Sequence, residues 1–429
     1  MYLTDEEKRM LDGEYGIVRQ KCMEFLLDEG RAAGAERLID LDGTADFHTP
    51  QTAMCYRYQF SLDDLRELVA TGAKFKVPTF ANKSPFTKGK VTCVHGWKNC
   101  GMEPYNDADY HEMSMQKEFL DLYRQMGMMT IHSCDYYLAS TYWPSQGQHC
   151  AWNESSAIPW ANAVLGARTN IDGCFATAFL GKAPEYGFHL DENRYATVLV
   201  NSQRKITTDQ EYDLFGFAVG EECGLDVPAF VNMSKPTTTQ FLKLHSAMNT
   251  SGSVHMYHIP GTTPEAPDVS YAFHGRKPQR EVMIDDQRLR KAYDTLNYYT
   301  SDEVDMVSLG CPHMTIVDLM RLAEKLRGKK LKVPMWIMTI PWLYNIAEEL
   351  GYLKVFEDAG ANLMSGTCPA AMGGVPKGVR VLALDSAKQS YYITGRYPNE
   401  GNRLQVCYGT QDECIEAALT GKWRGEWRG

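Results

Sequence analysis

The chain has 429 residues, of which 44% are hydrophobic and 23% charged, and its formal net charge is −10. This length exceeds one simple core and predicts two or three lobes with the composition of a soluble globular protein. The negative charge argues against nucleic acid as the main partner, and no apolar run approaches the roughly 18–20 residues of a membrane span.

The N-terminal segment is polar and acidic, unlike a signal or transit peptide, so a cytoplasmic protein is expected. Thr4 and Glu7 form a capping-box pattern that predicts the first helix, and apolar residues at helical spacing continue the pattern over 17–27. A second helix is expected from Ser61. Further helices are expected over residues 113–125, 160–165, 207–217, 237–248, 287–295, 315–326 and 343–350. Strands are expected over 38–41, 74–77, 197–200, 304–308, 335–339 and 379–384.

Strands that alternate with helices predict an α/β fold with largely parallel sheets. Such folds place their sites in the turns that follow the strands. The polar, Pro-rich stretch 262–280 indicates a boundary between lobes.

The chain has twelve cysteines, at irregular spacing and with no C-x-x-C pair. A disulfide framework is not expected without an export signal. Most of these cysteines are expected to be reduced core residues, and Cys22, Cys174, Cys407 and Cys414 fit this interpretation well.

Two cysteines instead stand in Gly/Pro contexts that predict turns: Cys311 in Gly310-Cys311-Pro312-His313 and Cys368 in Gly366-Thr367-Cys368-Pro369. A thiol on such a turn is accessible to a metal. With Cys134 as a third candidate, the chain would supply the three thiolates of an open iron–sulfur cluster.

Polar segments suggest further chemistry. Glu154 offers an acid or base, and Arg168 offers a bidentate fork for an anion. The alternative for this stretch is a helix cap at Ser155 or Ser156 with a surface ion pair. Lys388, which follows a predicted strand, can meet an anion or simply be solvated. The sequence lacks the P-loop, strand-linked G-x-G-x-x-G, H-E-x-x-H and G-x-S-x-G motifs.

Taken together and in order, these segments resemble one family, the aconitase X group of the aconitase superfamily. The resemblance runs along nearly the whole chain. It rests on the opening Leu3-Thr4-Asp5-Glu6-Glu7 and Leu11-Asp12-Gly13-Glu14-Tyr15-Gly16, on Val77-Pro78-Thr79 with Asn82, Glu154-Ser155-Ser156-Ala157, Asn162 with Gly166-Ala167-Arg168-Thr169-Asn170, Pro184-Glu185-Tyr186-Gly187, Gly310-Cys311-Pro312-His313, Thr367-Cys368 and Asp385-Ser386-Ala387-Lys388.

The resemblance implies a multi-lobe, three-layer α/β/α core and a hydro-lyase that uses an iron–sulfur cluster as a Lewis acid. Family activities include dehydration of cis-3-hydroxy-L-proline, the first choice of substrate here, and of mevalonate 5-phosphate. The chain resembles the large, cluster-bearing part and lacks the swivelling domain. A separate small subunit is therefore the implied partner.

Carried over by motif, the resemblance implies roles for thirteen residues. The expected cluster ligands are Cys134, Cys311 and Cys368. The expected substrate-binding residues are His48, Thr79, Asn82, Ser155, Arg168, Asn170 and Lys388. Glu154, His189 and His313 are the candidates for proton transfer or orientation of the hydroxyl group, although the base itself is often a serine of the swivelling domain.

The chain departs from the family pattern at two places in the expected site. Tyr136 stands two residues after Cys134, where a proline is expected, and Phe80 follows Thr79, where the family tends to have a second threonine. Because the chain also lacks the pair of cysteines two residues apart that aconitase uses, clusters of two, three or four irons all remain open. Two other functions remain open as well: an isomerase or racemase on a related acid, and a non-catalytic subunit that binds an anion and a partner protein.

Overall fold

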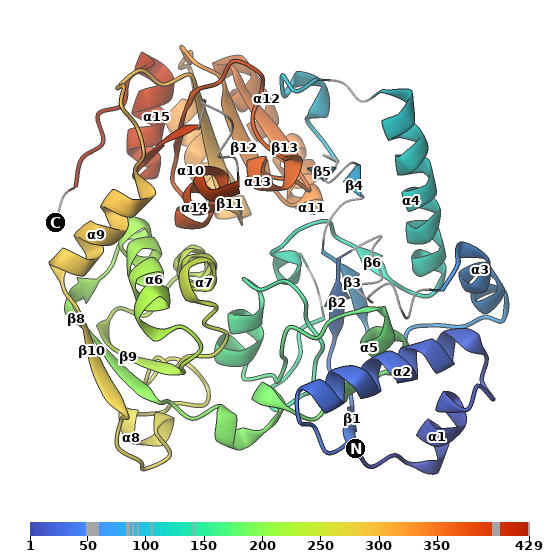
Figure 1. Ribbon diagram of the computed structural model, residues 1–429. Helices are drawn as coiled ribbons and strands as arrows, with labels where there is room; N and C mark the ends of the chain where they lie inside the picture. The colour runs from blue at the N-terminus through green and yellow to red at the C-terminus, as the bar shows by residue number, and fades with distance from the viewer. Residues whose placement is uncertain are drawn as a thin grey trace.

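The computed structural model describes residues 1–48, 60–82, 86–87, 90–91, 94–103, 106–139, 142–396 and 404–427. The described chain forms three lobes, residues 1–193, 194–297 and 298–427, and Figure 1 colours the first from blue to green, the second from green to yellow and the third from orange to red. No helix in these ranges is both long and apolar enough to cross a membrane.

The first lobe contains a small parallel sheet of order β2-β3-β6, with antiparallel pairs β1-β7 and β4-β5 beside it. Its elements are α1 Asp5–Leu11, α2 Ile17–Ala32, β1 Leu38–Asp40, β2 Ala45–Phe47, α3 Leu62–Ala70, β3 Thr79–Ala81, β4 Phe86–Thr87, β5 Lys90–Val91, α4 Asp107–Gln125, β6 Met129–Thr130, α5 Phe175–Leu180 and β7 Lys182–Pro184. Short 3-10 turns cover Trp97–Asn99, Tyr136–Leu138, Gly187–His189 and Asp191–Asn193, and a π-helical turn covers Trp160–Val164. Edge-to-face contacts of Phe47 with Tyr123 and Phe175 lie in its core.

The second lobe contains a parallel sheet of order β10-β8-β9. Its elements are β8 Val198–Ile206, α6 Asp209–Cys223, β9 Pro228–Met233, α7 Thr238–Gly252, α8 Val269–Ala272, β10 Arg280–Ile284 and α9 Asp286–Leu296. Helices α6 and α7 pack closely because Gly220 faces Gly252, and a Cβ atom on Gly220 would meet Ser251 Oγ at 2.0 Å. The Pro-rich stretch 262–280 lies within this lobe, between α7 and β10.

The third lobe contains a five-stranded parallel sheet of order β13-β12-β11-β14-β15. Its elements are β11 Met306–Met314, α10 Ile316–Leu326, β12 Met335–Thr339, α11 Pro341–Glu349, α12 Tyr352–Ala359, β13 Ala361–Ser365, α13 Pro369–Met372, β14 Val381–Leu384, α14 Ala387–Arg396, β15 Gln405–Tyr408 and α15 Gln411–Thr420. From β11 the chain builds outward to β13 and then returns to the other side of β11, so the strand order reverses between β11 and β14. A reversal of this kind opens a crevice at the carboxyl ends of the strands.

Both faces of this sheet are covered. Successive strand residues point to opposite faces. Val307 and Ala383 therefore pack into the core of the third lobe, whereas Met306 and Leu382 pack into a larger core shared with the second lobe. This layering, with mostly parallel sheets in several lobes, confirms the predicted α/β class.

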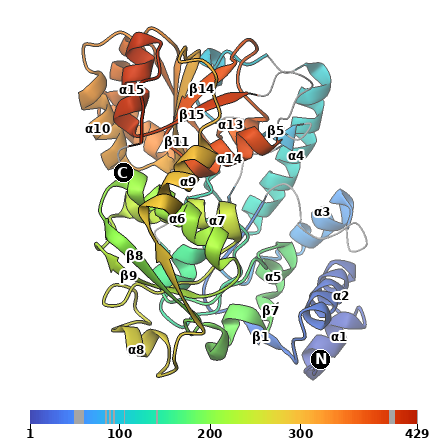
Figure 2. The ribbon, with the colours of Figure 1, turned by 60° about the vertical axis from the view of Figure 1, so that its left-hand side comes forward.

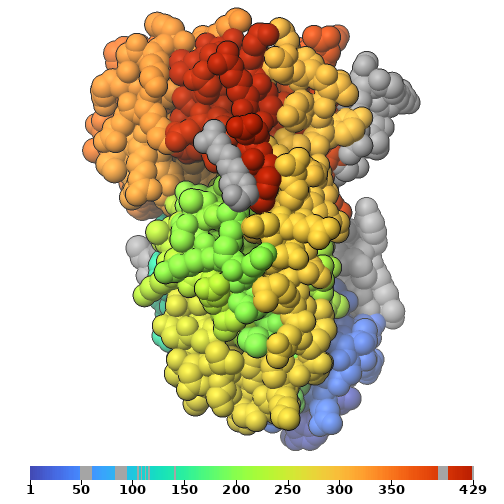
Figure 3. Space-filling view, turned by 90° about the vertical axis from the view of Figure 1, so that its left-hand side faces the viewer, coloured from blue at the N-terminus to red at the C-terminus, as the bar shows by residue number. Residues whose placement is uncertain are grey.

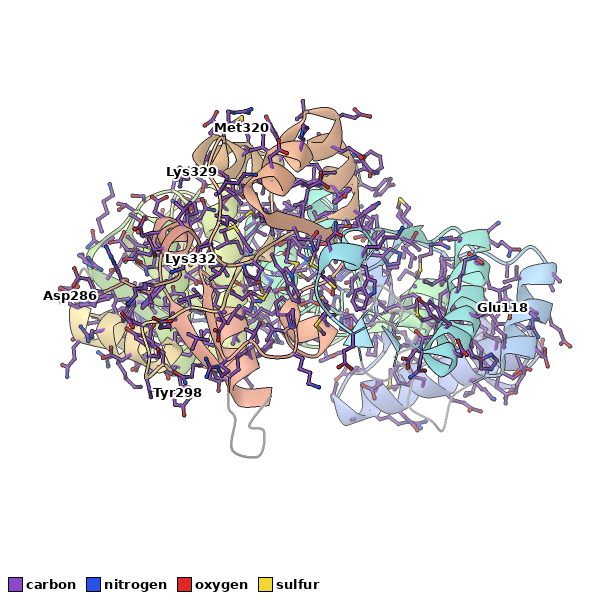
Figure 4. The ribbon with its side chains drawn as sticks, turned by 90° about the horizontal axis from the view of Figure 1, so that it is seen from above. Glu118, Asp286, Tyr298, Met320, Lys329 and Lys332 are labelled. Carbon is purple, nitrogen blue, oxygen red and sulfur yellow. The ribbon has the colours of Figure 1, made fainter. Side chains whose placement is uncertain are left out.

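Figures 2 and 3 show the third lobe stacked on the second, with α9 joining them at one side. Seen from above, Met320 on α10 and Glu118 on α4 lie on different sides of the molecule, so the first lobe stands beside the other two (Figure 4). The carboxyl end of β11 has the first lobe as a neighbour, because the Ser133 hydroxyl lies 2.8 Å from the His313 ring.

Several predicted elements agree with the structure. The capping box predicted at Thr4 begins α1, and the helices expected from Ser61 and Thr315 begin there as α3 and α10, each also with a capping box. The predicted strand over 74–77 is wrong: the Phe75 and Lys76 N–H groups donate to carbonyls of Met126 and Ala178, at the ends of two different helices, and so form no ladder.

The predicted turn at Cys311 is also different in detail. Strand β11 continues to Met314, but its pairing with β12 passes from Leu309–Ile337 to Met314–Thr339. Residues 310–313 therefore bulge out of the sheet opposite Met338. The bulge needs glycine at its start, because Gly310 has φ +95° and a Cβ there would lie 2.3 Å from the Met338 carbonyl oxygen.

Candidate functional site

Three thiols from three separate segments line one cavity of about 260 Å³. Cys311 lies in the bulge of β11, Cys368 occupies the N-cap position of α13, and Cys134 lies in the loop after β6. Cys311 is buried and hydrogen-bonds to Cys368, and Cys134 lies near enough to each of them for their charges to interact. The third lobe thus supplies two thiols and the first lobe supplies one.

The thiol of Cys368 is poised to ionise. The hydrogen bond from Cys311 lowers the pKa of Cys368 to about 6, against the effect of burial, and the Ala371 N–H adds to the shift. The same hydrogen bond raises the pKa of Cys311, and burial raises the pKa of Cys134. Thiolates are the form that binds metal, and the Lys388 ammonium lies close enough to favour the charged state of all three.

A buried ion pair forms another wall of the cavity. Lys388 Nζ lies 3.3 Å from Glu154 Oε1 and 3.3 Å from Ser156 Oγ, while the Ser156 hydroxyl donates to Glu154 Oε1 over 3.1 Å. Burial opposes the charge of Lys388, but Glu154 and the neighbouring thiols raise its pKa overall. His48 Nε2 lies 3.5 Å from the other oxygen of Glu154.

A carboxylate beneath the cavity orients Asn82. Asp46 is fully buried and accepts hydrogen bonds from Asn82 Nδ2 at 2.5 Å, the Tyr136 hydroxyl at 3.0 Å and the Asn153 N–H at 2.7 Å. Burial raises the pKa of Asp46 to about 7. Because Asn82 Nδ2 is held by Asp46, its Oδ1 is left as a buried acceptor with no protein partner, at the wall of the cavity.

Nine of the thirteen predicted site residues line this cavity: His48, Asn82, Cys134, Glu154, Ser155, Cys311, His313, Cys368 and Lys388. The sequence alone could not show that they converge, because they come from segments spread over two lobes.

The other four predicted residues lie elsewhere. The guanidinium of Arg168 binds the His189 carbonyl and the Asp191 carboxylate and lines a different cavity. The His189 ring lies 3.1 Å from an oxygen of Asp172. Asn170 bonds to backbone groups of Tyr186 and Phe188, in the loop after β7, and Thr79 is buried with its hydroxyl on the Val77 carbonyl.

Sequence reasoning missed several polar residues at the site, and five of them are Asp46, Ser133, Asp135, Thr367 and Gln389. Three of them are direct neighbours of a predicted cysteine, so adjacency to a ligand candidate was an available signal. Gln389 directly follows the predicted Lys388, whereas Asp46 lies next to no predicted site residue.

The donor set suits an iron–sulfur cluster, because three soft sulfur donors share one cavity and leave room for further iron coordination. A different group, Cys134, Asp135 and His313, also brings its ligand atoms within 4.8 Å of one another. Both ring nitrogens of His313 already hydrogen-bond within the protein, as does the Asp135 carboxylate, so this group suits a supporting role better.

The comparisons with known proteins agree with this architecture. The crystal structure of Thermococcus kodakaraensis aconitase X in its holo-form superposes with a TM-score of 0.79 and 34% sequence identity, over 97% of this chain and 100% of that one. The fold and the site thus define an aconitase-like α/β enzyme.

The family follows from the sequence matches. Models of the first, second and third domains of aconitase X match residues 1–192, 196–294 and 304–420. A phosphomevalonate dehydratase large subunit from Thermococcus kodakarensis is 35% identical over 92% of this chain and 95% of that protein. A cis-3-hydroxy-L-proline dehydratase from Pseudomonas aeruginosa is 31% identical over 97% of this chain and 70% of that protein. The chain belongs to the aconitase X family, and because these relatives are dehydratases, the predicted class of hydro-lyase is confirmed.

Proposed function

We propose that this chain is the large subunit of an iron–sulfur hydro-lyase that dehydrates a small hydroxy acid. The observation that carries the proposal is the convergence of Cys134, Cys311 and Cys368 on one cavity beside the Glu154–Lys388 pair. A family name alone would not fix a site, whereas three thiols from two lobes around one cavity have few structural uses.

The proposed roles follow from charge and contact. Cys134, Cys311 and Cys368 would hold the cluster, which supplies a Lewis acid for the departing hydroxyl group. Lys388 would bind an anionic group of the substrate. Glu154, which already shares hydrogen bonds with Ser156 and Lys388, would accept or deliver a proton at its Oε1 or Oε2.

The first candidate substrate is cis-3-hydroxy-L-proline. Three buried oxygens without a protein partner belong to residues that line the cavity: Asn82 Oδ1, Thr367 Oγ1 and Gln389 Oε1. Buried acceptors of this kind favour a ligand that brings its own donors, such as an ammonium and a hydroxyl group. Among the described residues of the cavity, Lys388 is also the one lysine or arginine, which suits a single carboxylate.

The second candidate is mevalonate 5-phosphate. Five relatives named phosphomevalonate dehydratase large subunit match this chain at 28–35% identity, and the chain covers 94–100% of each. Their names also support a separate small subunit as the partner here. That subunit would supply the part of the longer cis-3-hydroxy-L-proline dehydratases that this chain does not cover, and with it the catalytic base.

The test is anaerobic reconstitution of the purified chain with iron and sulfide, followed by visible and EPR spectra and by iron analysis. We expect an iron–sulfur signal that is lost in Cys311→Ser and Cys368→Ser. With a small subunit added, both candidate acids are then assayed for loss of water by mass spectrometry.

The outcomes separate the alternatives. A chain that stays colourless and binds no iron would refute the cluster. Turnover in which the product keeps the elements of water would indicate an isomerase or racemase. If the native chain shows no turnover, and Cys311→Ser still binds the small subunit and an anion as the native chain does, the chain is a non-catalytic binding subunit.

A further inference from the structure

The ring of His313 connects the three segments that carry the thiols. His313 stands two residues after Cys311 and is 4% exposed. Its Nδ1 lies 2.8 Å from the hydroxyl oxygen of Ser133, the neighbour of Cys134. Its Nε2 lies 2.9 Å from the carbonyl oxygen of Thr367, the neighbour of Cys368. One side chain therefore contacts the residue next to each of the other two cysteines.

The direction of these hydrogen bonds is fixed by chemistry. A carbonyl oxygen only accepts, so Nε2 of His313 carries the hydrogen and donates it to Thr367. In the neutral ring Nδ1 then accepts from the Ser133 hydroxyl, whose oxygen accepts in turn from the Asp135 N–H over 3.0 Å. Neither ring nitrogen keeps a lone pair for a substrate proton or a metal.

Asp135 makes a second, independent connection between the same segments. One carboxylate oxygen accepts the backbone N–H of His313 over 2.9 Å and lies 3.4 Å from the Cys134 sulfur. The other oxygen accepts the Tyr137 hydroxyl over 3.3 Å. The loop of Cys134 is thus tied to the backbone of the bulge at a second point, while the His313 ring makes the contact to Ser133.

We propose that His313 is a positioning residue that sets the spacing of the three thiols before any cluster is bound, rather than a group that transfers a proton. The inference rests on the proposed function in one respect, namely that the thiols are cluster ligands. Replacing a residue that orients metal ligands without binding the metal itself typically lowers the metal affinity 10- to 100-fold.

The test compares His313→Gln with a matched control, His258→Gln. His258 is 2% exposed and its Nε2 also meets a backbone carbonyl, that of Arg194, at 2.7 Å, but it lies outside the cavity of the thiols. Both variants lose a buried imidazole with the same type of bond. Circular dichroism and thermal melts first establish that each variant is folded.

The first measurement uses the chain without a cluster. Dibromobimane becomes fluorescent when it alkylates two neighbouring thiols, and peptide mass spectrometry identifies the pair. In the native chain and in His258→Gln we expect adducts that join pairs of the three cysteines Cys134, Cys311 and Cys368. In His313→Gln we expect much less of the adducts that contain Cys134 or Cys368. The second measurement is retention of iron against a chelator after reconstitution, which His313→Gln should weaken about 10- to 100-fold.

Equal cross-linking and equal iron retention in His313→Gln and His258→Gln would overturn the inference. If His313→Gln does not fold, Ser133→Ala removes one of the two ring bonds, and unchanged cross-linking of Cys134 in that variant would overturn it as well. A native chain that cross-links its three thiols but binds no iron would refute the proposed function while leaving the positioning role supported.

Discussion

The Lys388 ammonium pairs with a carboxylate and a hydroxyl group at the wall of the cavity. Its Nζ is shared between Glu154 and Ser156, each at 3.3 Å, and it faces the cavity of the thiols. Charged groups that are buried without a partner are costly, so the ion pair keeps both charges in place while the cavity is empty. An anionic substrate would compete with Glu154 for the same ammonium and would thereby release the carboxylate for proton transfer.

We therefore expect Lys388→Met to lower kcat/KM about 100-fold, since a hydrogen bond to a charged group contributes about 1.5–3 kcal/mol. Steady-state kinetics of the complete enzyme measure this. Arg168→Ala serves as the comparison: its guanidinium bonds to Asp191 outside the cavity, so it should reduce thermal stability more than kcat/KM. If Arg168→Ala lowers kcat/KM more than Lys388→Met does, Arg168 rather than Lys388 binds the anion.

The comparison of Lys388 with Arg168 also shows where reasoning from sequence ends at this scale. Both were predicted to hold an anion, and both are chemically suited to it. The choice between them depends on contacts that cannot be read from sequence spacing. Arg168 is directed away from the cavity by its bonds to the loop of His189 and Asp191, and such long-range contacts leave no pattern in the sequence.

At the scale of elements, Asp213 joins three of them. It lies on α6, and one carboxylate oxygen accepts the Ala387 N–H at the start of α14 over 2.7 Å and the Tyr408 hydroxyl of β15 over 3.1 Å. Its other oxygen is buried without a partner. Burial, partly offset by Lys243 and these donors, raises the pKa of Asp213 from 3.8 to about 7.

This shift predicts a pH dependence of stability. The folded chain keeps the Asp213 proton up to about pH 7, whereas the unfolded chain loses it near 3.8, so stability falls as the pH rises through that window. The effect is on the order of 4 kcal/mol at most. Asp213→Asn should reduce the difference in melting temperature between about pH 5 and about pH 7.5, leaving the part due to Asp46, whose pKa is also raised.

Melting curves of the chain without a cluster measure this difference, with Asp294→Asn on the solvent side of α9 as the control. A pH dependence that is the same in Asp213→Asn, in the control and in the native chain would contradict the prediction.

Sequence patterns located the elements better than the irregular places between them. Capping boxes at Thr4, Ser61 and Thr315 follow from local side-chain chemistry, and each begins a helix. The bulge at Gly310 depends on how β11 pairs with β12, a strand that comes later in the chain. The sequence therefore predicted a turn there, but it did not show that the turn lies inside a strand.

For the whole molecule, the order of motifs predicted the family and the fold class, because both are properties of the complete chain. The convergence of the thiols was beyond prediction, since it depends on how the first lobe sits against the third. That arrangement is fixed by contacts such as the Trp336 indole N–H on the Cys100 carbonyl at 3.1 Å and the Asn362 amide on the Gly96 carbonyl at 2.9 Å.

Because Cys134 belongs to the first lobe and the other two thiols to the third, a cluster would link the lobes covalently. A group that binds only the folded chain stabilises it by about 2.7 kcal/mol at a hundred times its dissociation constant. We expect reconstitution to raise the melting temperature by roughly 3–8 °C in the native chain. Cys134→Ser should lose most of this rise, because its cluster, if formed, would be held by the third lobe alone.

Cys407→Ser is the matched control, since Cys407 is a fully buried thiol of the third lobe that does not line the cavity. Its loss should lower the melting temperature with and without iron and sulfide but leave the rise on reconstitution intact. Differential scanning fluorimetry under anaerobic conditions measures all three chains. A rise of the same size in Cys134→Ser would mean that the metal is held within one lobe, and the link between the lobes would then rest on protein contacts alone.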